Sequence, residues 1–521
     1  MIAMTAERPD DLGLAAVALP GAFPTWRASL APGALRPACE RASAQGGRLI
    51  ALWGCDETDL GRGFRLNVAL LVRSGLVCLD VALPCEHPHY PGIDDIFPAA
   101  GRMQRATYDL LGLHAQGSAD ARKWLRHGAW PGGIFPLRRG VPLRPQFEPA
   151  PDGYPFVRVE GEGVHEVAVG PVHAGTIEPG HFRFSIVGEA VLRLEERLGY
   201  THKGIEKRAE EMTFAEGARL AGRVSGDSTV AYAWAYAQAI ESILGVEVPE
   251  RVQGLRALLL ELERVHNHLG DLGYLGNDVA LAFGFFQFWR LKERVLRANA
   301  QLFGHRYLMD CIVPGGIAPE PPAQSAAVLE ALCADIEAEV RTLRVIYDEH
   351  AGVQDRFMGA GRIAPAAAQA LGLTGLAGRA SGLAADLRVD HPIAPYDRLE
   401  VRMATHAAGD VAARVAVRFD EVFESLRLIR LLCRELPAGP SSAQMPLSAQ
   451  GGYGVGLVEG WRGEVLVAAE SADGRHLRRL HPHDPSWQNW PLIERAVIDN
   501  IVPDFPLINK SFNLSYSGHD L

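Results

Sequence analysis

Apolar and polar residues alternate in two different ways along the chain, and the change between them predicts two structural parts. In the first 150 residues the apolar positions form short runs separated by turn residues, a pattern typical of strands. Gly75 lies in a three-residue break that predicts a hairpin, and 104–113 predicts a short helix that ends at Gly112. The predicted strands are 48–53, 64–72 and 76–83.

Beyond about residue 200 the apolar positions recur at helical spacing over long stretches. Thr213 and Glu216 fit a capping box, in which a hydroxyl and a carboxylate satisfy free amides at a helix start. We therefore expect one helix over 213–243 that stops at Gly245, and several long helices in series predict a bundle. Further helices are predicted at 252–275, 281–303, 322–358, 405–436 and 493–501, and extended segments at 166–171, 183–193 and 451–470.

Proline and glycine mark a linker between the two parts. Residues 145–155 hold four prolines and a glycine, which favour neither a helix nor a strand. We divide the chain into a weakly patterned N-terminal segment (1–45), a first domain (46–150), a linker (151–165) and a second domain (166–521).

Composition narrows the class of protein. With 521 residues the chain is too long for a single core, and its formal net charge of −10 argues against a nucleic-acid partner. No stretch is long and apolar enough to predict a membrane span, and residues 1–8 show no secretory signal. The seven cysteines are scattered, so we expect reduced thiols in a cytoplasmic setting and no iron–sulfur cluster held by this chain.

Several motifs resemble two related families. The segment 170–184, Gly-Pro-Val-His-Ala-Gly-Thr-Ile-Glu-Pro-Gly-His-Phe-Arg-Phe, resembles the opening of the large subunit of group 4, energy-converting nickel–iron hydrogenases. The quinone-site, D-type subunit of NADH-quinone oxidoreductase (complex I) opens similarly. The motifs that match this family further along are 201–207, 263–268, 312–316 and 409–414. Those that resemble the C-type subunit of complex I are 106–113, 122–125 and 135–138.

The resemblance covers about 45–521, and it implies the fold. We expect an α+β chain with an N-terminal α/β domain like the C-type subunit of complex I. A mainly helical domain like the nickel–iron hydrogenase large subunit and the D-type subunit of complex I would follow. A C-like part fused to a D-like part is the arrangement of hydrogenase-3 and hydrogenase-4 large subunits, so the chain resembles hydrogenase-4 component G.

The metal-binding cysteines of that family are missing. Active members hold nickel and iron with four thiolates, in an Arg-x-Cys-Gly-x-Cys motif and an Asp-Pro-Cys-x-x-Cys motif. Here 223–228 is Arg-Val-Ser-Gly-Asp-Ser and 513–518 is Asn-Leu-Ser-Tyr-Ser-Gly. Thiolates suit nickel, whereas a serine hydroxyl stays protonated near neutral pH. We expect no bound nickel–iron, and a polar remnant cavity with Asp227 where the cysteine positions have become Ser225, Ser228, Ser515 and Gly518.

The loop at 170–184 carries the candidates for proton transfer. Glu178 matches the glutamate that passes protons to the metal in group 4 hydrogenases, and the alternative is an ordinary surface charge. For proton transfer near neutrality we expect burial to raise its pKa. His173 or His181 would be the histidine that holds a quinone in complex I. The partner tyrosine of that quinone site falls at Gly226, with Tyr232 nearby.

Four further features have two interpretations each. Glu206 matches a magnesium-binding glutamate, or it forms an ion pair with Lys203 or Lys207. Arg223 positions a ligand, or it pairs with Asp227 at i,i+4 spacing. His266 and His268 lie near Glu263, where helix packing is favoured over a metal site. His519 and Asp520 either close the cavity or belong to a frayed C-terminus.

The resemblance also implies partners and a location. We expect an iron–sulfur small subunit resembling the B-type subunit of complex I, and ion-translocating membrane subunits. The chain would lie peripherally on the cytoplasmic side of the cell membrane, and electrons from the partner's cluster would reach an acceptor in the former metal cavity. The alternatives are a non-catalytic scaffold subunit and an NADH-quinone oxidoreductase-type quinone site. No dinucleotide fingerprint follows a predicted strand, so direct NAD binding is not indicated.

Overall fold

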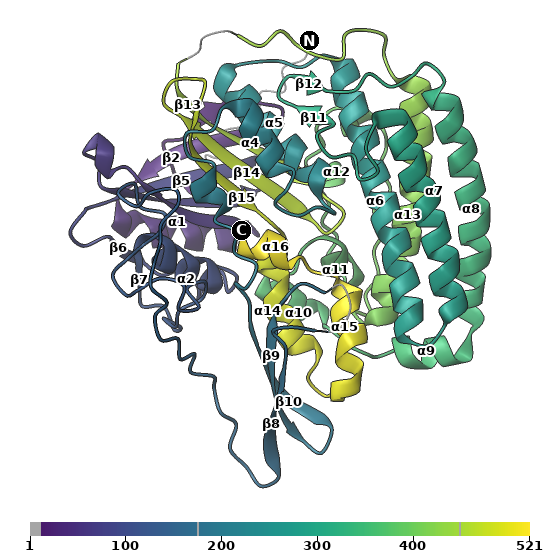
Figure 1. Ribbon diagram of the computed structural model, residues 1–521, viewed down its shortest axis with the longest axis horizontal. Helices are drawn as coiled ribbons and strands as arrows, with labels where there is room; N and C mark the ends of the chain where they lie inside the picture. The colour runs from purple at the N-terminus through teal and green to yellow at the C-terminus, as the bar shows by residue number, and fades with distance from the viewer. Residues whose placement is uncertain (1–11, 174–176, 447–449) are drawn as a thin grey trace.

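The computed structural model describes residues 12–173, 177–446 and 450–521. A sheet domain from the N-terminal part lies on one side of the molecule and a bundle of long helices on the other (Figure 1). Strands from the last third of the chain lie between them (Figure 1). The predicted mixed fold, with strands first and mainly helices afterwards, is confirmed.

The N-terminal domain is built on a five-stranded sheet in the order β1-β2-β5-β4-β3. β2 runs parallel to β5, and the other neighbours are antiparallel. The predicted strands, the hairpin and the helix end at Gly112, where φ is 78°, are all present. The elements are β1 (Val17–Leu19), β2 (Thr25–Leu30), α1 (Pro32–Ala44), β3 (Arg48–Asp56), β4 (Phe64–Val72), β5 (Gly75–Leu83) and α2 (Ala100–Leu111), with a small parallel pair, β6 (His89–Pro91) and β7 (His114–Gln116).

Three of these elements come from the first 45 residues, whose pattern predicts none. β1 and β2 are short, and their exposed and buried positions do not alternate regularly. α1 begins with proline and carries a second proline, Pro37, so its helical signal is weak. They form because they add to a sheet that the later strands define.

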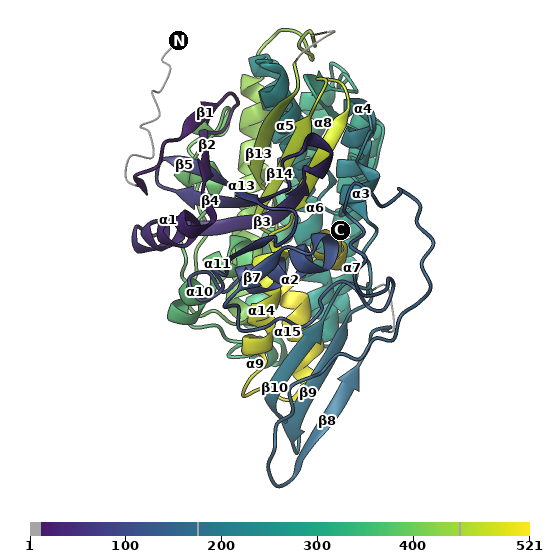
Figure 2. The same cartoon turned by 90° about the vertical axis from the view of Figure 1, so that its left-hand side faces the viewer.

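The second part opens with a small antiparallel sheet that projects from the body (Figure 2). It consists of β8 (Val164–Val169), β9 (His181–Val187) and β10 (Ala190–Arg197). The extended segment predicted at 166–171 is confirmed, whereas the one predicted at 183–193 is divided into two strands by a turn at 188–189. The loop between β8 and β9 belongs to the motif at 170–184, of which 174–176 lie outside the described residues.

The helix predicted over 213–243 is wrong in one respect, because it is broken in the middle. After α3 (Ile205–Arg208), the capping box of Thr213 and Glu216 starts α4 (Phe214–Ala221), and α5 (Thr229–Leu244) ends at Gly245 as predicted. Residues 222–228 form a turn between α4 and α5. Serine, aspartate and glycine fill this turn, and such residues favour local hydrogen bonds over continued helix. The break places the 223–228 motif at the start of α5.

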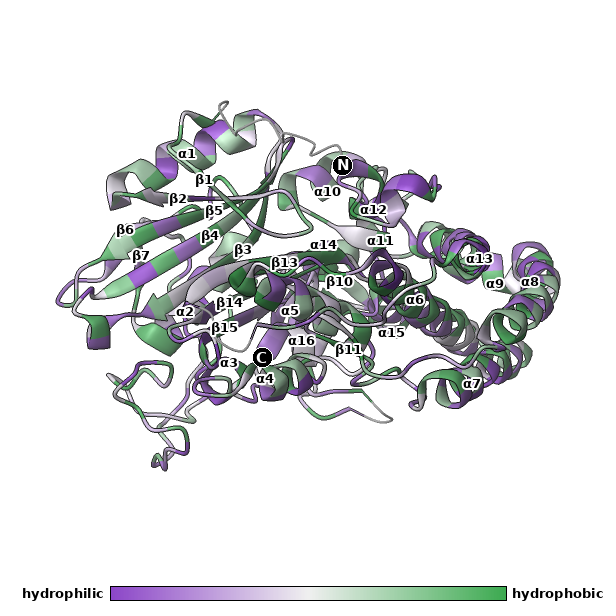
Figure 3. Ribbon diagram, turned by 90° about the horizontal axis from the view of Figure 1, so that it is seen from above, coloured by the Kyte–Doolittle hydropathy of each residue, from purple (hydrophilic) through white to green (hydrophobic). Residues whose placement is uncertain are grey.

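Four long helices form the bundle, which Figure 3 shows nearly end-on. They are α6 (Glu250–Asp278), α7 (Ala282–Phe303), α8 (Ser325–Glu349) and α13 (Val411–Glu435), which confirms the predicted bundle. The helix predicted over 322–358 divides at His350, whose extended backbone starts α9 (Ala351–Phe357). The shorter elements around the bundle are β11 (Ile312–Val313), β12 (Gly316–Ile317), α10 (Pro365–Leu371), α11 (Gly375–Ala380) and α12 (Leu387–Asp390).

The C-terminal segment 452–521 forms an antiparallel sheet and three short helices. The sheet is β13 (Gly452–Glu459), β14 (Glu464–Ser471) and β15 (Leu477–His483), and the helices are α14 (Ser486–Ala496), α15 (Phe505–Phe512) and α16 (Tyr516–Asp520). The helix predicted at 493–501 is displaced, because α14 starts seven residues earlier. There the Asp484 carboxylate accepts the Ser486 amide, and Trp487, Trp490 and Ile493 bury one face.

The β13–β15 sheet joins the N-terminal domain to the rest of the molecule. An apolar cluster combines Trp53 and Cys55 of β3 with Tyr453 and Leu466 of the later sheet. Around it, Arg48 pairs with Glu464, Arg65 with Glu470 and Arg478 with Asp59. Within the part of the chain that the structure describes, no helix is long and apolar enough to cross a bilayer.

Candidate functional site

Two motifs about 290 residues apart meet in the structure. Ser225 lies in the turn between α4 and α5, Ser515 lies just before α16, and their Oγ atoms are 2.9 Å apart. Ser515 Oγ also accepts the Gly518 amide at 2.8 Å, which caps α16. Ser225, Ser228 and Ser515 are 2%, 3% and 4% exposed. The positions expected to correspond to the metal-binding cysteines therefore converge, and two of their hydroxyls bond to each other.

An arginine from the later sheet enters this place. Arg462, in the turn between β13 and β14, donates to both carboxylate oxygens of Asp227 at 2.9 and 2.5 Å and to Ser228 Oγ at 3.2 Å. Burial alone would raise the pKa of Asp227, but the guanidinium charge holds that pKa well below its usual range. The Asp227 side chain keeps 38% exposure, whereas Arg462 keeps 5%. We call Ser225, Asp227, Ser228, Arg462 and Ser515 the serine site.

The i,i+4 pair between Arg223 and Asp227 is not formed. Arg223 instead binds Asp310 with two hydrogen bonds, of 2.6 and 2.7 Å, and both side chains are exposed. Because the turn interrupts the helix, Arg223 and Asp227 do not share a helical face. Arg223 therefore lies on the outer side of the turn and Asp227 on its inner side.

Asp484 takes up the space beside Gly518, the fourth of the expected ligand positions. A Cβ atom built on Gly518 would lie 2.4 Å from Asp484 Oδ2, so any side chain there would require the carboxylate to move. Tyr232 donates its hydroxyl to the same oxygen at 2.8 Å. Burial raises the pKa of Tyr232 well above its usual value. The phenol nearest in sequence to the expected quinone tyrosine is thus already bound to a carboxylate.

His173 in the β8–β9 loop and His181 at the start of β9 each bond to the backbone of the motif at 170–184. His173 Nε2 donates to the Gly180 carbonyl at 2.8 Å, and His181 Nδ1 lies 3.3 Å from the Gly170 carbonyl. Burial lowers the pKa of His181. Neither histidine has a contact with the serine site among the hydrogen bonds of the described residues.

Glu178 is exposed, so the expected burial is wrong. Its loop lies on the surface of the molecule, but the carboxylate still reaches the C-terminal motif, where Oε2 accepts the Ser517 amide at 3.1 Å. Glu178 therefore connects solvent with the segment that carries Ser515.

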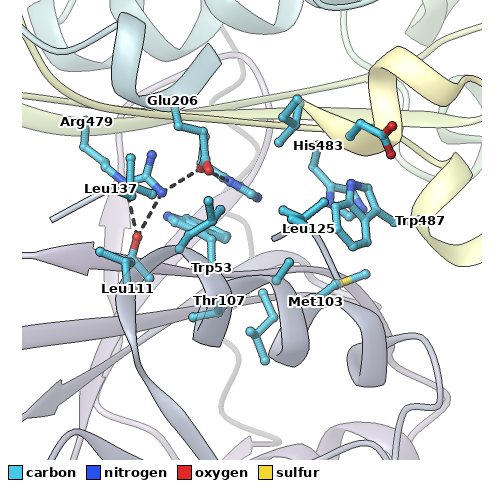
Figure 4. Close-up of a pocket in the computed structure, with 17 residues that line it drawn as sticks. Trp53, Met103, Thr107, Leu111, Leu125, Leu137, Glu206, Arg479, His483 and Trp487 are labelled. Carbon is cyan, nitrogen blue, oxygen red and sulfur yellow. Dashed lines mark hydrogen bonds and ion pairs between the residues drawn. The ribbon is translucent and has the colours of Figure 1, made fainter. Parts of the chain in front are cut away.

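Glu206 binds neither of the lysines expected for it. Its Oε1 accepts from Arg479 at 2.6 Å and from His481 Nδ1 at 2.7 Å (Figure 4). Burial raises its pKa, but Arg479 and His481 lower it more, to about 2. Lys203 Nζ donates to the Val224 carbonyl, and Lys207 Nζ to Glu210. Glu206 has these partners because β15 packs against α3 and places Arg479 beside the carboxylate.

The surroundings of Glu206 do not fit magnesium, which prefers several oxygen ligands and retained waters. Instead, the Arg479 guanidinium and the His481 imidazole both bind the Glu206 carboxylate. The cavity beside it measures about 30 Å³, which is room for a water molecule, and apolar side chains such as Leu125 and Trp53 form much of its wall (Figure 4). In the described ranges, no group of three or more His, Cys, Asp or Glu side chains could hold a metal ion.

The side chains of Glu263, His266 and His268 point to different partners, as packing on a helix requires. Glu263 accepts the amides of Val230 and Ala231 at the start of α5, at 2.6 and 3.2 Å. His268 Nε2 lies 2.7 Å from Glu421, and His266 meets the ring of Tyr307 edge-on.

The C-terminal residues are buried rather than frayed. Asp520 accepts from the Gly199 amide and from the amide and hydroxyl of Thr201, at 2.7–2.9 Å. The ring of His519 stacks on Trp487 at 4.0 Å between centroids. This docking holds Ser515 and Gly518 in place beside the α4–α5 turn.

Sequence reasoning missed Arg462 and Asp484, which contribute the charge of the site. A usable signal exists for Arg462, because it stands between Gly460 and Gly463 in a tight turn that joins two apolar strands. The short turn restricts the backbone of such an arginine and therefore the direction in which its side chain points. Asp484 gives no comparable signal, since it resembles any polar residue that starts a helix.

Comparison with known proteins identifies the class. The family described as respiratory-chain NADH dehydrogenase, 30 Kd subunit, matches residues 29–147, and the 49 Kd subunit family matches 278–451. Formate hydrogenlyase subunit 5 of Escherichia coli is 32% identical over 484 residues, which cover 91% of this chain and 85% of that protein. The chain belongs to the family of fused 30 kDa- and 49 kDa-type subunits related to complex I.

Two further relatives show the breadth of the family. Hydrogenase-4 component G of E. coli is 31% identical over 91% of this chain and 84% of its own length. The C/D subunit of NADH-quinone oxidoreductase from Phocaeicola vulgatus is 30% identical over 76% of this chain and 80% of its own length. A chain of the membrane-bound sulfane sulfur reductase, an archaeal respiratory membrane complex, superimposes with a TM-score of 0.65 at 25% identity, over 69% of this chain and 99% of that chain. The relatives thus include subunits of hydrogenase and complex I assemblies.

Proposed function

We propose that this chain is the large subunit of a membrane-associated redox complex, related to complex I and hydrogenase-4, that works without nickel–iron. The observation that carries the proposal is the serine site itself. Ser225 and Ser515 occupy converged ligand positions and bond to each other at 2.9 Å, while Asp484 fills the place of a side chain at Gly518. A cluster that needs four thiolates finds two bonded hydroxyls and an Arg462–Asp227 pair.

In this function an iron–sulfur subunit resembling the B-type subunit of complex I delivers electrons, and ion-translocating membrane subunits use the energy released. The chain lies peripherally on the cytoplasmic side of the membrane. We propose the division expected from the sequence, with domains at 46–150 and 166–521 and a linker at 151–165, except that the first domain also includes β1, β2 and α1 of the 1–45 segment. The site offers a cation, hydroxyls and a carboxylate open to solvent, which suits a polar acceptor. The names of two relatives, hydrogenase-4 component G and the C/D subunit of NADH-quinone oxidoreductase, support this assignment.

One observation favours a scaffold as the second candidate. The hydroxyls of Ser225 and Ser515 are satisfied within the protein, so they leave no free donor for a ligand. The 38% exposure of Asp227 favours the redox function instead, because a closed remnant would bury this side chain.

Metal content and hydrogen turnover test the loss of nickel–iron. We expect elemental analysis of the purified native complex to find no stoichiometric nickel, and we expect neither hydrogen uptake with a dye nor hydrogen production. A nickel–iron hydrogenase purified by the same procedure is the positive control. One nickel per chain, or measurable hydrogen uptake, would refute the proposal.

Glu178 provides the test of proton delivery. Its exposed carboxylate bonds to Ser517, two residues from Ser515, and so lies between water and the site. We expect Glu178→Gln to leave assembly intact and to lower electron transfer by about tenfold or more, as is usual for a positioned acid–base group. Glu166→Gln, which removes an exposed carboxylate paired with Arg183 on the neighbouring strand, is the control. Equal turnover of wild type and Glu178→Gln would favour the scaffold.

A further inference from the structure

A cluster of charged side chains lies entirely inside the second part of the molecule. α6, α11, α12 and its N-cap residue, α13 and β13 each contribute to it, and every member is at most 4% exposed. We call it the charge cluster. Its members are Glu261, Arg264, His268, Arg379, Asp386, Arg388, Glu421 and Glu459.

Short contacts make the cluster continuous. Arg379 binds Glu421 at 2.7 Å and Glu459 at 2.9 Å, so one guanidinium joins two carboxyl groups. Arg388 similarly binds Asp386 at 2.7 Å and Glu261 at 3.1 Å. Arg379 and Asp386 approach to 3.7 Å and so connect the two halves.

The charges of the cluster do not balance unless a proton is bound. It contains four carboxyl groups but three guanidinium groups, and a guanidinium keeps its proton in proteins. An uncompensated charge in a site closed to water costs several kcal/mol. One group must therefore carry a proton, and the choice lies between His268 and a carboxyl group.

The contacts of His268 disfavour it as the carrier. Its Nε2 bonds to Glu421 at 2.7 Å, but Nδ1 has no hydrogen-bond partner among the described residues. Protonation would place a second N–H at Nδ1, buried and without an acceptor. Burial accordingly lowers the pKa of His268.

Glu459 is the carboxyl group with the weakest stabilisation of its charged form. It accepts from Arg379 at 2.9 Å and from the Leu387 amide at 3.3 Å. Glu261, in contrast, accepts from Arg388 and from the hydroxyls of Tyr396 and Ser425 at 2.7 and 2.6 Å. Burial, with the negative charge of Asp386, raises the pKa of Glu459 to about 7, although Arg379 opposes this.

The turn between β13 and β14 connects Glu459 with the serine site. Arg264 donates to the carbonyls of Glu459 and Gly460, at 2.8 and 3.1 Å, and so fixes the start of the turn from inside the charge cluster. Trp461, two residues after Glu459, donates its Nε1–H to the Asp227 carbonyl. The next residue, Arg462, binds the Asp227 carboxylate. The ring of Trp461 also faces the ring of His268 edge-on at 6.0 Å.

We propose that the charge cluster is a proton-binding site in which Glu459 holds an exchangeable proton, and that its occupancy follows the charge at the serine site. The redox part rests on the proposed function. When the partner's iron–sulfur cluster passes one electron to the acceptor at the serine site, chains in which Glu459 is ionised take one proton from a hydronium ion in solvent. An O–H bond forms at the Glu459 carboxylate as one O–H bond of hydronium breaks. The added negative charge is thereby compensated inside the protein.

Charged groups from every neighbouring element act on Glu459. Besides those of the charge cluster, Glu464 of β14 faces it, and Glu464 is in turn paired with Arg48 of β3. These groups are Glu261, Arg264 and His268 from α6, Arg379 from α11, Asp386 and Arg388 from α12 and its N-cap, Glu421 from α13, and Glu464 with Arg48.

Infrared spectroscopy of the purified full chain tests the proton directly. We expect the C=O band of a protonated, buried carboxylic acid at pH 5.5, and we expect it to fade as the pH rises through about 7. The buried carboxyl groups of Glu196 and Glu263, whose pKa values are raised to about 8, also contribute to this band, so we expect Glu459→Gln to lose only the component that titrates near 7. If no component titrates near 7 in wild type, or if that component persists in Glu459→Gln, the proposal is wrong. If Glu459→Gln fails to fold, Glu464→Gln decides, because removing the negative charge that faces Glu459 should move the component to lower pH, and an unmoved component would contradict the proposal.

Thermal unfolding gives an independent readout. Because the pKa of Glu459 is higher in the folded chain than in the unfolded one, its proton stabilises the fold at low pH, and this contribution is lost as the pH rises through about 7. We expect the melting temperature of wild type to fall more than that of Glu459→Gln between pH 5 and pH 8. Parallel pH profiles would contradict a proton on Glu459.

The link to the serine site is tested in the intact complex. We expect the midpoint potential of the partner's iron–sulfur cluster to fall with rising pH near neutrality in wild type and to change less with pH in Glu459→Gln. Equal pH slopes in the two proteins would overturn the link. The infrared and thermal measurements need no turnover, so they judge the proton site even if the redox function proves wrong.

Discussion

The serine site and the charge cluster lie at the two ends of one turn, 459–462, and they are held by different interactions. The serine site combines hydrogen bonds between neutral hydroxyls and amides with a single ion pair, whose carboxylate is 38% exposed. The charge cluster contains seven ionisable acidic or guanidinium groups and a histidine, and it is closed to water. Neutral bonds can be replaced at small cost, whereas a buried charge cannot lose its partner cheaply. We therefore expect substitutions in the serine site to cost less stability than substitutions in the charge cluster.

The largest expected effect is on the charge cluster. Arg388→Met removes the guanidinium that binds both Asp386 and Glu261, so two buried carboxylates lose their main counter-charge. We expect the free energy of unfolding to fall by about 3–5 kcal/mol in urea denaturation. Arg398→Met is the control, because Arg398 is 46% exposed and its pair with Glu250 spans 3.8 Å; about 0.5 kcal/mol or less is expected. A loss below about 1 kcal/mol for Arg388→Met would contradict the contrast between the two regions.

An intermediate effect is expected for the ion pair of the serine site. Asp227→Asn leaves the buried Arg462 without a carboxylate, but the exposure of Asp227 moderates the loss to about 1–2 kcal/mol. The pKa of Asp227 is lowered in the fold, so its contribution is present above the usual Asp range and is lost as the pH falls below it. The difference between wild type and variant should therefore shrink from pH 6 to pH 3. Asp310→Asn, at an exposed pair with Arg223, is the matched control and should change little at either pH.

The smallest effect is expected for a neutral member of the serine site. Ser225→Ala removes the bonds to Asp227 at 2.8 Å and to Ser515 at 2.9 Å, and we expect a loss of about 1 kcal/mol. Ser228→Ala, whose hydroxyl accepts from Arg462 at 3.2 Å, should cost less. Denaturation curves of both variants measure the difference. A loss above about 3 kcal/mol for Ser225→Ala would show that the serine site tolerates change as poorly as the charge cluster.

Most of the fold could be predicted because its signals are local. The apolar periods of α6, α7 and α13 are long, and Gly112, Gly245 and the Thr213 capping box fix element ends. The predictions failed where a contact distant in sequence decides the structure. The turn at 222–228 forms where a serine motif meets the C-terminal segment, and β1 and β2 have little pattern until β5 provides a partner.

The site could be predicted only in part, for a related reason. The motifs at 223–228 and 513–518 are recognisable as segments, and the structure brings them together. Arg462, which supplies the positive charge, comes from a strand turn more than 230 residues from Asp227. Glu206 shows the same limit, because its partners, Arg479 and His481, lie 273 and 275 residues away, while the nearby lysines bind elsewhere. Spacing along a helix predicts neighbours on that helix and gives no information about a strand that folds back later.

The β13–β15 sheet packs against the N-terminal domain through an apolar cluster and three ion pairs, although the two are separated by more than 300 residues of chain. The two parts therefore recognise each other through their contact surfaces, and the linker proposed at 151–165 would chiefly keep each part at a high local concentration beside the other. We expect a chain cut within that linker to yield two polypeptides that still assemble. A single fused gene and a pair of separate genes would then encode the same assembly of the two parts.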